Sequence, residues 1–407
     1  MKRLRLQTLS PLHIGNGETL KPLSYVKDKS FIYVLNTEAF FREIAKIQKR
    51  NAYLNWLEPI INGILETKNK IANAKDNFEL KRALNITRRD FENQLSVDGF
   101  IKNLINKNPV EFAKSCTQYK IPFSSPPQTE GFKMAVKGGN GRAYVPGTEI
   151  KGSIRTSLLY YLLQEDCNYK ILKDETLNLR AIFKQGILPK ERIRAFRKGS
   201  EKIERALFRG LEDNANHDFF RFVSISDSTH LSRDKLRIET TKMLGTTRFT
   251  KVFIETINPL SELEFDLCLD YKELSFENLG LKGLKEYQDK DKILYACYVH
   301  SKDILDKESK YFSSKPEILS LINKLKKENQ PNSPLLKIGA GQGFLSITIN
   351  LIMQKKGDME LYDEVIREGV SSMRRWRTIK DNFPKTRRVV IDSRGNEISL
   401  MGWCKIL

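Results

Sequence analysis

The clearest structural signal in the sequence is the segment YVPGTEIKGSIRTSLLYYLL, residues 144–163. Pro146-Gly147 marks a backbone bend, and the good helix formers after it predict a helix. Lys151 and Arg155 are four residues apart, so they share one face of that helix near its start. A glycine bend that leads into a helix N-terminus is a common phosphate-binding arrangement. We therefore predict phosphate contacts at Gly147, Lys151, Gly152 and Arg155.

Two other glycine stretches stand close to strand-like or helix-like segments. HIGNGE comes shortly after residues 2–9, whose alternation predicts a strand, and KIGAGQG occupies residues 337–343. Glycine lets a backbone approach a sugar-phosphate chain closely, so that free N–H groups meet the phosphates. The alternative is that these glycines only serve tight turns. The contacts predicted in the two stretches are His13, Gly15, Gly17, Lys337, Gly339, Gly341 and Gly343.

The charge balance favours a polyanionic partner. Lys and Arg total 70 against 50 Asp and Glu, a formal net charge of +20. This excess indicates nucleic acid before an anionic membrane, unless the source proteome is simply rich in lysine. Residues 180–209 are strongly basic, and in Met373–Arg388 Trp376 lies among arginines, as in single-stranded RNA sites or on a helix face with a buried Trp. Arg142 and Arg248 are further predicted phosphate contacts.

The chain shows no sign of a membrane or a disulfide framework. No apolar run approaches the roughly 20 residues that cross a bilayer, and the N-terminus lacks the apolar core of a signal peptide. Scattered cysteines without a CxxC pair argue against zinc and fit a reducing cytoplasm. The five cysteines are Cys116, Cys167, Cys268, Cys297 and Cys404.

Strand-like and helix-like segments are interspersed without a regular βαβα rhythm. This order favours an α+β fold over a doubly wound parallel sheet. Residues 37–120 predict a helical insertion, and residues 386–407 a C-terminal hairpin. A length of 407 residues suggests two or three domains. We place them at 1–255, including the insertion, and at 256–407, including the glycine loop 337–344.

Three enzyme templates fit the glycine stretches poorly. Gly147 and Gly152 have Walker A spacing, but Ser153-Ile154 stand where Lys-Ser/Thr is needed. GAGQGF is one residue short of the Rossmann fingerprint. It matches the first motif of S-adenosylmethionine-dependent methyltransferases better, but only 64 residues follow Gly343, too few for the rest of that fold. A methyltransferase remains a remote alternative.

Taken together, LSPLHIGNGE, YVPGTEIKGSIRTSLL, KIGAGQGF and the closing RRVVIDSRGNEISLMGWCKIL resemble the repeat-associated mysterious proteins (RAMPs) of CRISPR systems. Their set and order are most similar to the Csm-family subunit that caps the 3′ end of the guide RNA in type III-A complexes. The resemblance spans nearly the whole chain. It implies two tandem ferredoxin-like, RRM-like domains, binding to the 3′ part of the CRISPR RNA (crRNA), and contact with the repeated backbone subunit. It also implies support for crRNA trimming by recruited host nucleases, with no metal and no cofactor.

Some relatives in this superfamily are metal-independent endoribonucleases that use a histidine, so that activity is the main alternative. His13, His217, His230 and His300 have no evident catalytic partner in the sequence. We predict that His13 orders its loop. Asp227 lacks a neighbouring carboxylate for a two-metal site, so we predict that it caps a turn. We therefore predict no catalytic residue and no enzyme activity.

Overall fold

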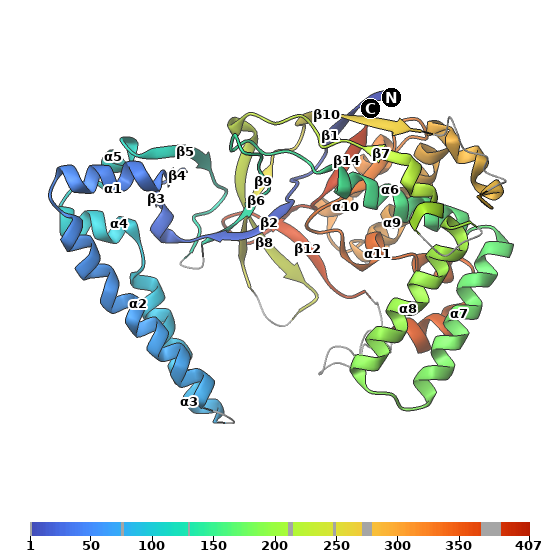
Figure 1. Ribbon diagram of the computed structural model, residues 1–407, viewed down its shortest axis with the longest axis horizontal. Helices are drawn as coiled ribbons and strands as arrows, with labels where there is room; N and C mark the ends of the chain where they lie inside the picture. The colour runs from blue at the N-terminus through green and yellow to red at the C-terminus, as the bar shows by residue number, and fades with distance from the viewer. Residues whose placement is uncertain are drawn as a thin grey trace.

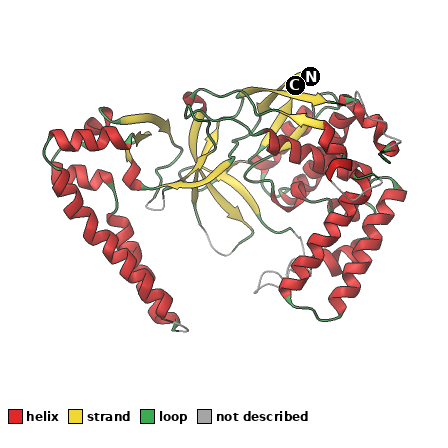
Figure 2. Ribbon diagram, in the orientation of Figure 1, coloured by secondary structure: helices red, strands yellow, loops and turns green. Residues whose placement is uncertain are grey.

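The computed structural model describes residues 2–74, 77–128, 131–210, 215–246, 250–270, 279–367 and 384–407. Two β-sheets occupy the middle of the molecule, and helices lie on both sides of them (Figures 1 and 2). The N- and C-terminal ends of the chain lie next to each other (Figure 1). The predicted α+β class is confirmed.

The first sheet joins both ends of the chain. Its spatial order is β11-β14-β1-β10-β7, and all neighbouring strands are antiparallel. In β1, Leu4 and Leu6 are buried whereas Arg3 and Arg5 are exposed, as alternation requires for a sheet covered on one face. Helices α6 and α9 share the core under it. These elements are β1 (Lys2–Thr8), α6 (Gly147–Leu162), β7 (Val223–Ile225), β10 (Glu262–Leu269), α9 (Lys290–Tyr311), β11 (Leu335–Lys337) and β14 (Trp403–Ile406).

The second sheet has the order β13-β12-β8-β9-β6-β2, with β6 and β9 parallel. Its strands are β2 (Gly15–Leu20), β6 (Phe132–Ala135), β8 (Leu236–Leu244), β9 (Val252–Ile257), β12 (Arg387–Ile391) and β13 (Glu397–Ser399). Residues 13–18, predicted as a glycine loop, extend into the edge strand β2, because Thr19 and Leu20 pair with Lys133 and Phe132 of β6. Gly15–Thr19 are exposed.

The predicted insertion, residues 37–120, is part of a larger lobe that begins at Pro22, ends at Pro122 and has its own core. A three-stranded sheet, β3-β4-β5, supports the helices, and Phe40, Tyr53, Phe100 and Phe112 pack together beneath them. Helices α2 and α3 extend from the lobe as a long hairpin (Figure 1). The elements are η1 (Pro22–Ser24), β3 (Tyr25–Lys27), β4 (Phe31–Leu35), α1 (Thr37–Lys46), α2 (Arg50–Asn73), α3 (Phe78–Gln94), α4 (Val97–Phe100), the π-helical η2 (Ile101–Ile105), α5 (Pro109–Lys114) and β5 (Thr117–Pro122).

The basic stretch 180–209 is divided between two helices, because the chain turns at Gly186, where φ is +73°. These helices, α7 (Asp166–Lys184) and α8 (Pro189–Phe208), form a second hairpin. No helix among the described residues is long and apolar enough to cross a membrane. The remaining elements are η3 (Ala215–His217), η4 (Phe219–Phe222), η5 (Arg233–Lys235), η6 (Lys282–Gln288), α10 (Pro316–Glu328), α11 (Gly343–Ile347), α12 (Leu351–Lys355), α13 (Met359–Leu361) and η7 (Tyr362–Arg367).

The strand pairing does not divide at the predicted boundary 255/256. In the first sheet β1 lies between β10 and β14, and in the second sheet β12 pairs with β8. Each sheet therefore takes strands from both sides of the boundary. The pattern of local segments could not show this, because it does not reveal which distant strands pair.

Candidate nucleic-acid interface

The first and third glycine stretches lie against each other. The backbone N–H of Ala340 donates to the carbonyl oxygen of His13 over 2.8 Å. Gly339 has a φ of +68°, and a Cβ there would lie 2.4 Å from the same oxygen, so this approach requires glycine. We call Gly15–Gly17 together with Gly339–Gly343 the glycine cradle.

Part of the cradle is bare backbone open to solvent. Gly17 and Gly343 are exposed, both have positive φ, and no atom lies within 4 Å of the Cβ position of either. Other glycines of the cradle serve internal packing, since a Cβ on Gly341 would lie 2.9 Å from Cβ of Met401. Some glycines of the cradle therefore permit tight packing inside the protein. Others leave backbone uncovered at the surface, as a phosphate contact requires.

His13 lies beneath the cradle and is buried. Its Nδ1 lies 2.7 Å from the carbonyl oxygen of Glu255, which it must meet as a donor. Burial lowers the pKa of the imidazole, and the charges of Lys133 and Arg388 lower it further. The ring is therefore neutral near pH 7, and its contact with Glu255 ties the loop to β9.

Two cations that the sequence analysis missed stand close enough to affect His13. Lys133 is exposed on β6, and Arg388 on β12 donates to Oγ1 of Thr241 over 3.1 Å. Among the described residues neither has a carboxylate partner. No local signal marks them, because only the pairing of the second sheet brings them close to His13.

The N-terminus of α6 already holds a carboxylate. The N–H of Gly147 donates to Oδ1 of Asp227 over 2.8 Å, so Asp227, predicted to cap a turn, caps this helix. A Cβ on Gly147 would lie 2.3 Å from the carbonyl oxygen of Ile225. The proline-glycine bend thus seats α6 against the end of β7, and the position predicted for a phosphate at Gly147 is occupied by Asp227.

Lys151 and Arg155 lie on the same face of α6, but within the described part of the chain only Arg155 is bound by carboxylates. The Arg155 guanidinium donates to both carboxylate oxygens of Asp218, at 2.8 and 3.0 Å, and also to Glu204. It lies over the rings of Phe208 and Phe220. Lys151 is half-buried and has no carboxylate partner among the described residues, and burial lowers its pKa. Gly152 beside it is exposed.

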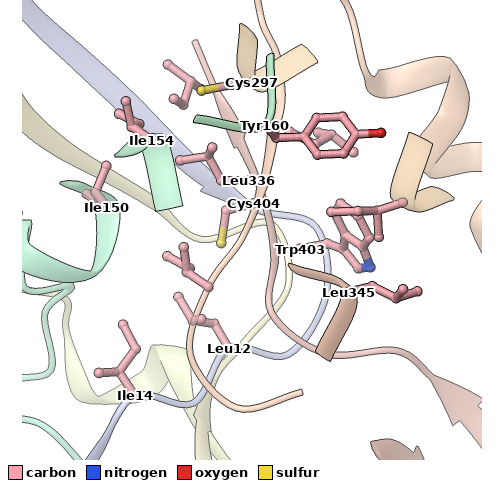
Figure 3. Packing of buried hydrophobic residues seen from close by; sticks show 14 of the residues in the cluster. Leu12, Ile14, Ile150, Ile154, Tyr160, Cys297, Leu336, Leu345, Trp403 and Cys404 are labelled. Carbon is pink, nitrogen blue, oxygen red and sulfur yellow. The ribbon is translucent and has the colours of Figure 1, made fainter. Parts of the chain in front are cut away.

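The apolar neighbours of all three glycine stretches meet in one core (Figure 3). This arrangement places the stretches around a common cluster although they are far apart in sequence. The contributors are Leu12 and Ile14 at the first stretch, Ile150 and Ile154 from α6, and Leu336 and Leu345, which flank the third stretch.

Lys337, predicted as a phosphate contact, lies inside the protein. Its side chain is 6% exposed, and its Nζ lies 5.3 Å from the centre of the Trp403 ring. Burial lowers its pKa, while the carboxylate of Glu308 raises it. Glu308 also accepts a hydrogen bond from Nε of Arg387 over 2.6 Å. Lys337 therefore belongs to a buried charge cluster and does not face solvent.

A second surface site surrounds Arg142. This side chain is exposed, next to a groove of about 540 Å³ lined by Asn140, Arg142, Ser232, Arg233 and Asp234. The Tyr144 and His230 rings lie 5.4 Å apart, and we call this pair the Tyr144–His230 platform. A Cβ on Gly138 would lie 2.3 Å from Nε2 of His230, so glycine lets the loop press against that ring. In the sequence, this site is indicated by GGNGRAY, where glycines, Arg142 and Tyr144 lie close together.

We assign the remaining candidate residues to neither of these two surface sites. Arg248 and Trp376 are outside the described residues, as is most of Met373–Arg388. His300 is buried, and its Nδ1 contacts Oγ of Ser157 over 3.0 Å. Within the described ranges, no group of three or more His, Cys, Asp and Glu side chains is arranged to hold a metal ion.

Comparison with known proteins identifies the family of the chain. The RAMP superfamily matches residues 5–368. The CRISPR system Cms protein Csm5 of Methanocaldococcus jannaschii is 22% identical over 424 residues, covering 99% of this chain and 88% of the relative. Csm5 of Streptococcus thermophilus is 24% identical over 293 residues, 70% of each chain.

Two solved structures share the fold. One is a chain in a cryo-EM structure of a Csm–crRNA–target RNA ternary complex of a type III-A CRISPR-Cas system, with a TM-score of 0.68, 20% identity and full coverage of both chains. The other is the crystal structure of T. onnurineus Csm5, with a TM-score of 0.60, 17% identity and coverage of 98% and 99%. The predicted resemblance is confirmed: the chain belongs to the RAMP superfamily and is homologous to Csm5 of type III-A CRISPR Csm complexes.

Proposed function

We propose that this protein is a non-catalytic RNA-binding subunit of a type III-A Csm complex, and that it holds the 3′ part of the crRNA. The observation that supports this most is the glycine cradle, where exposed backbone with positive φ lies above His13, whose pKa the charges of Lys133 and Arg388 lower. Its relatives and the net charge of +20 support the same function.

The chemistry of the cradle suits a ribose-phosphate backbone. Backbone N–H groups meet phosphate oxygens, and the two cations supply the opposing charge. Such contacts position a strand without reading its bases. The described residues of the cradle offer no surface for a base, but the Tyr144–His230 platform does. An unstacked base can lie on its aromatic face while the Arg142 guanidinium meets the phosphate.

The geometry does not favour either catalytic alternative. A histidine for general acid–base cleavage must reach the RNA, whereas His13 is 5% exposed and its Nδ1 is held by Glu255. The methyltransferase motif requires a glycine loop at the carboxyl edge of a parallel sheet, but β11 pairs antiparallel with β14. We therefore assign neither cleavage nor methyl transfer to these loops.

We also propose one ferredoxin-like unit built from both ends of the chain. The elements β1, α6, β7, β10, α9 and β14 follow one another as β–α–β–β–α–β, and the four strands lie in the order β14-β1-β10-β7. The second sheet is the remainder of a second, less regular unit. We further propose contact with the repeated backbone subunit and recruitment of host nucleases for crRNA trimming, as the resemblance to the Csm-family capping subunit implies.

Binding of the purified chain to crRNA of its own system tests this function. RNAs shortened from the 3′ end should bind more weakly, whereas equal shortening from the 5′ end should leave affinity unchanged. Equal affinity for both series and for an unrelated RNA would exclude 3′ recognition.

A variant with Lys133→Gln and Arg388→Gln tests the cradle. Loss of two phosphate contacts should flatten the salt dependence of binding by about 1.4 in slope, since each contact on a single strand contributes about 0.7. The matched control is Arg82→Gln with Arg89→Gln, two exposed arginines of α3 outside the proposed interface. An unchanged slope in the cradle variant would remove these cations from the RNA site.

A further inference from the structure

Leu260 has an unusual backbone conformation and an unusual exposure. It lies in the short connection between β9 and β10, with a φ of +62°. Left-handed backbone brings the Cβ of an L-residue close to its carbonyl oxygen, so glycine or asparagine is usual there and a bulky aliphatic residue is rare. The Leu260 side chain is nevertheless 72% exposed, so packing within the chain does not explain it.

The connection is fixed by Thr8 at the end of β1. The Leu260 N–H donates to the Thr8 carbonyl oxygen over 2.6 Å, and the Thr8 N–H donates to the Ser261 carbonyl oxygen over 2.9 Å. The Thr8 hydroxyl donates to the Asn258 carbonyl oxygen over 2.7 Å and accepts from the Ser261 N–H over 3.0 Å. Thr8 is fully buried, so the connection holds Leu260 outward rigidly. A strained residue that its surroundings hold in place is typical of a functional position.

Leu260 also forms one wall of a groove of about 200 Å³. The other apolar walls are Leu9, Leu321, Leu325 and Leu400, from β1's end, α10 and the segment after β13. At the rim, Glu328 pairs with Lys405, while Lys324 is exposed and has no carboxylate partner among the described residues. The groove therefore combines aliphatic walls with one uncompensated positive charge.

We infer that Leu260 and this groove dock a neighbouring protein subunit, which presents an aliphatic side chain beside a carboxylate. The aliphatic side chain fills the leucine-lined groove, Leu260 packs against its flank, and the carboxylate meets Lys324. RNA fits poorly, because no aromatic ring lines the groove to stack a base. A symmetric contact with a second copy would bring two Lys324 charges together in a small interface. The inference rests on the proposed function in placing the chain within a complex, and it goes beyond it by locating the contact.

Photo-crosslinking in the assembled complex identifies the occupant. The full chain with Leu260→p-benzoylphenylalanine is co-expressed with the other proteins and the crRNA of its own system, irradiated and mapped by mass spectrometry. The expected product joins position 260 to another subunit, at a peptide with an aliphatic residue near an Asp or Glu. A cross-link to RNA, a cross-link to a second copy, or none in an assembled complex overturns the inference.

The Leu260→Gly variant tests docking without a loss of folding stability. Glycine tolerates the left-handed backbone, so the isolated variant should unfold at the same or a higher temperature than the native chain. Its incorporation into the complex should nevertheless weaken, by about tenfold in the concentration required, since a buried leucine is lost from the contact. Lys324→Glu should weaken incorporation further.

Leu188→Asp is the matched control, because Leu188 is 67% exposed at the start of α8, away from the groove. It should assemble as the native chain does, whereas Leu260→Asp should not. If the native chain fails to assemble, the proposed function fails. If native and Leu260 variants assemble alike, only the docking inference fails.

Discussion

Protonation of the buried His300 should make the free energy of unfolding depend on pH. His300 is 3% exposed between Ser157 and the ring of Tyr160, and burial lowers the pKa of its imidazole from 6.5 to about 4. The unfolded chain therefore takes up the proton first, so the stabilisation is complete above about pH 6.5 and is lost as the pH falls towards 4. The loss amounts to about 3 kcal/mol. Urea unfolding between pH 7.5 and 4.5 should show this decline, and His300→Gln should flatten it. An equal decline in that variant would assign it to other groups.

Lys151 and Arg155 should respond differently to substitution, although the sequence suggested one shared role. Arg155→Ala removes the contacts of α6 with Asp218 and Glu204, so the free energy of unfolding should fall by about 2 kcal/mol, a value reduced for its partial exposure. Its RNA salt slope should stay unchanged. Lys151→Ala should flatten that slope by about 0.7 without loss of stability. Measurements of the urea midpoint and the salt slope on both variants check these expectations. Lost stability in Lys151→Ala together with a flatter slope in Arg155→Ala would contradict them.

At the scale of elements, the Tyr144–His230 platform and the cradle should make separable contributions to binding. Stacking is sequence-tolerant and uncharged, so Tyr144→Ala should weaken RNA binding by about 1–3 kcal/mol with an unchanged salt slope. Arg142→Gln should flatten the slope instead. Fluorescence anisotropy over a salt series distinguishes the two. A Tyr144→Ala variant that binds as the native chain would leave the cradle as the RNA site and remove the platform.

Local sequence patterns predicted elements well where alternation and turn residues agree, as in β1 and the β12–β13 hairpin. They failed at β2, because its glycine-rich residues have low strand propensity and form a strand only through pairing with β6. The partners of Arg155 were also hidden, since Glu204 and Asp218 lie 49 and 63 residues further along. The same limit applies to Lys133 and Arg388, which reach His13 only through sheet pairing.

On the scale of the whole molecule, the interleaved sheets predict that the chain, apart from the inserted lobe, folds as a single unit. β1 hydrogen-bonds β10 on one side and β14 on the other, so residues 1–255 alone leave both edges of β1 unpaired. Residues 256–407 alone lack the strand that joins β10 to β14. Residues 256–407 expressed alone should therefore lack a cooperative thermal transition, and residues 1–255 alone should show only that of the inserted lobe. Co-expressed halves should associate and regain the transition of the whole chain. Circular dichroism and calorimetry on the three samples check this. Independent cooperative unfolding of residues 256–407, or of residues 1–255 beyond the lobe, would restore the division at 255/256 that the linear pattern suggested.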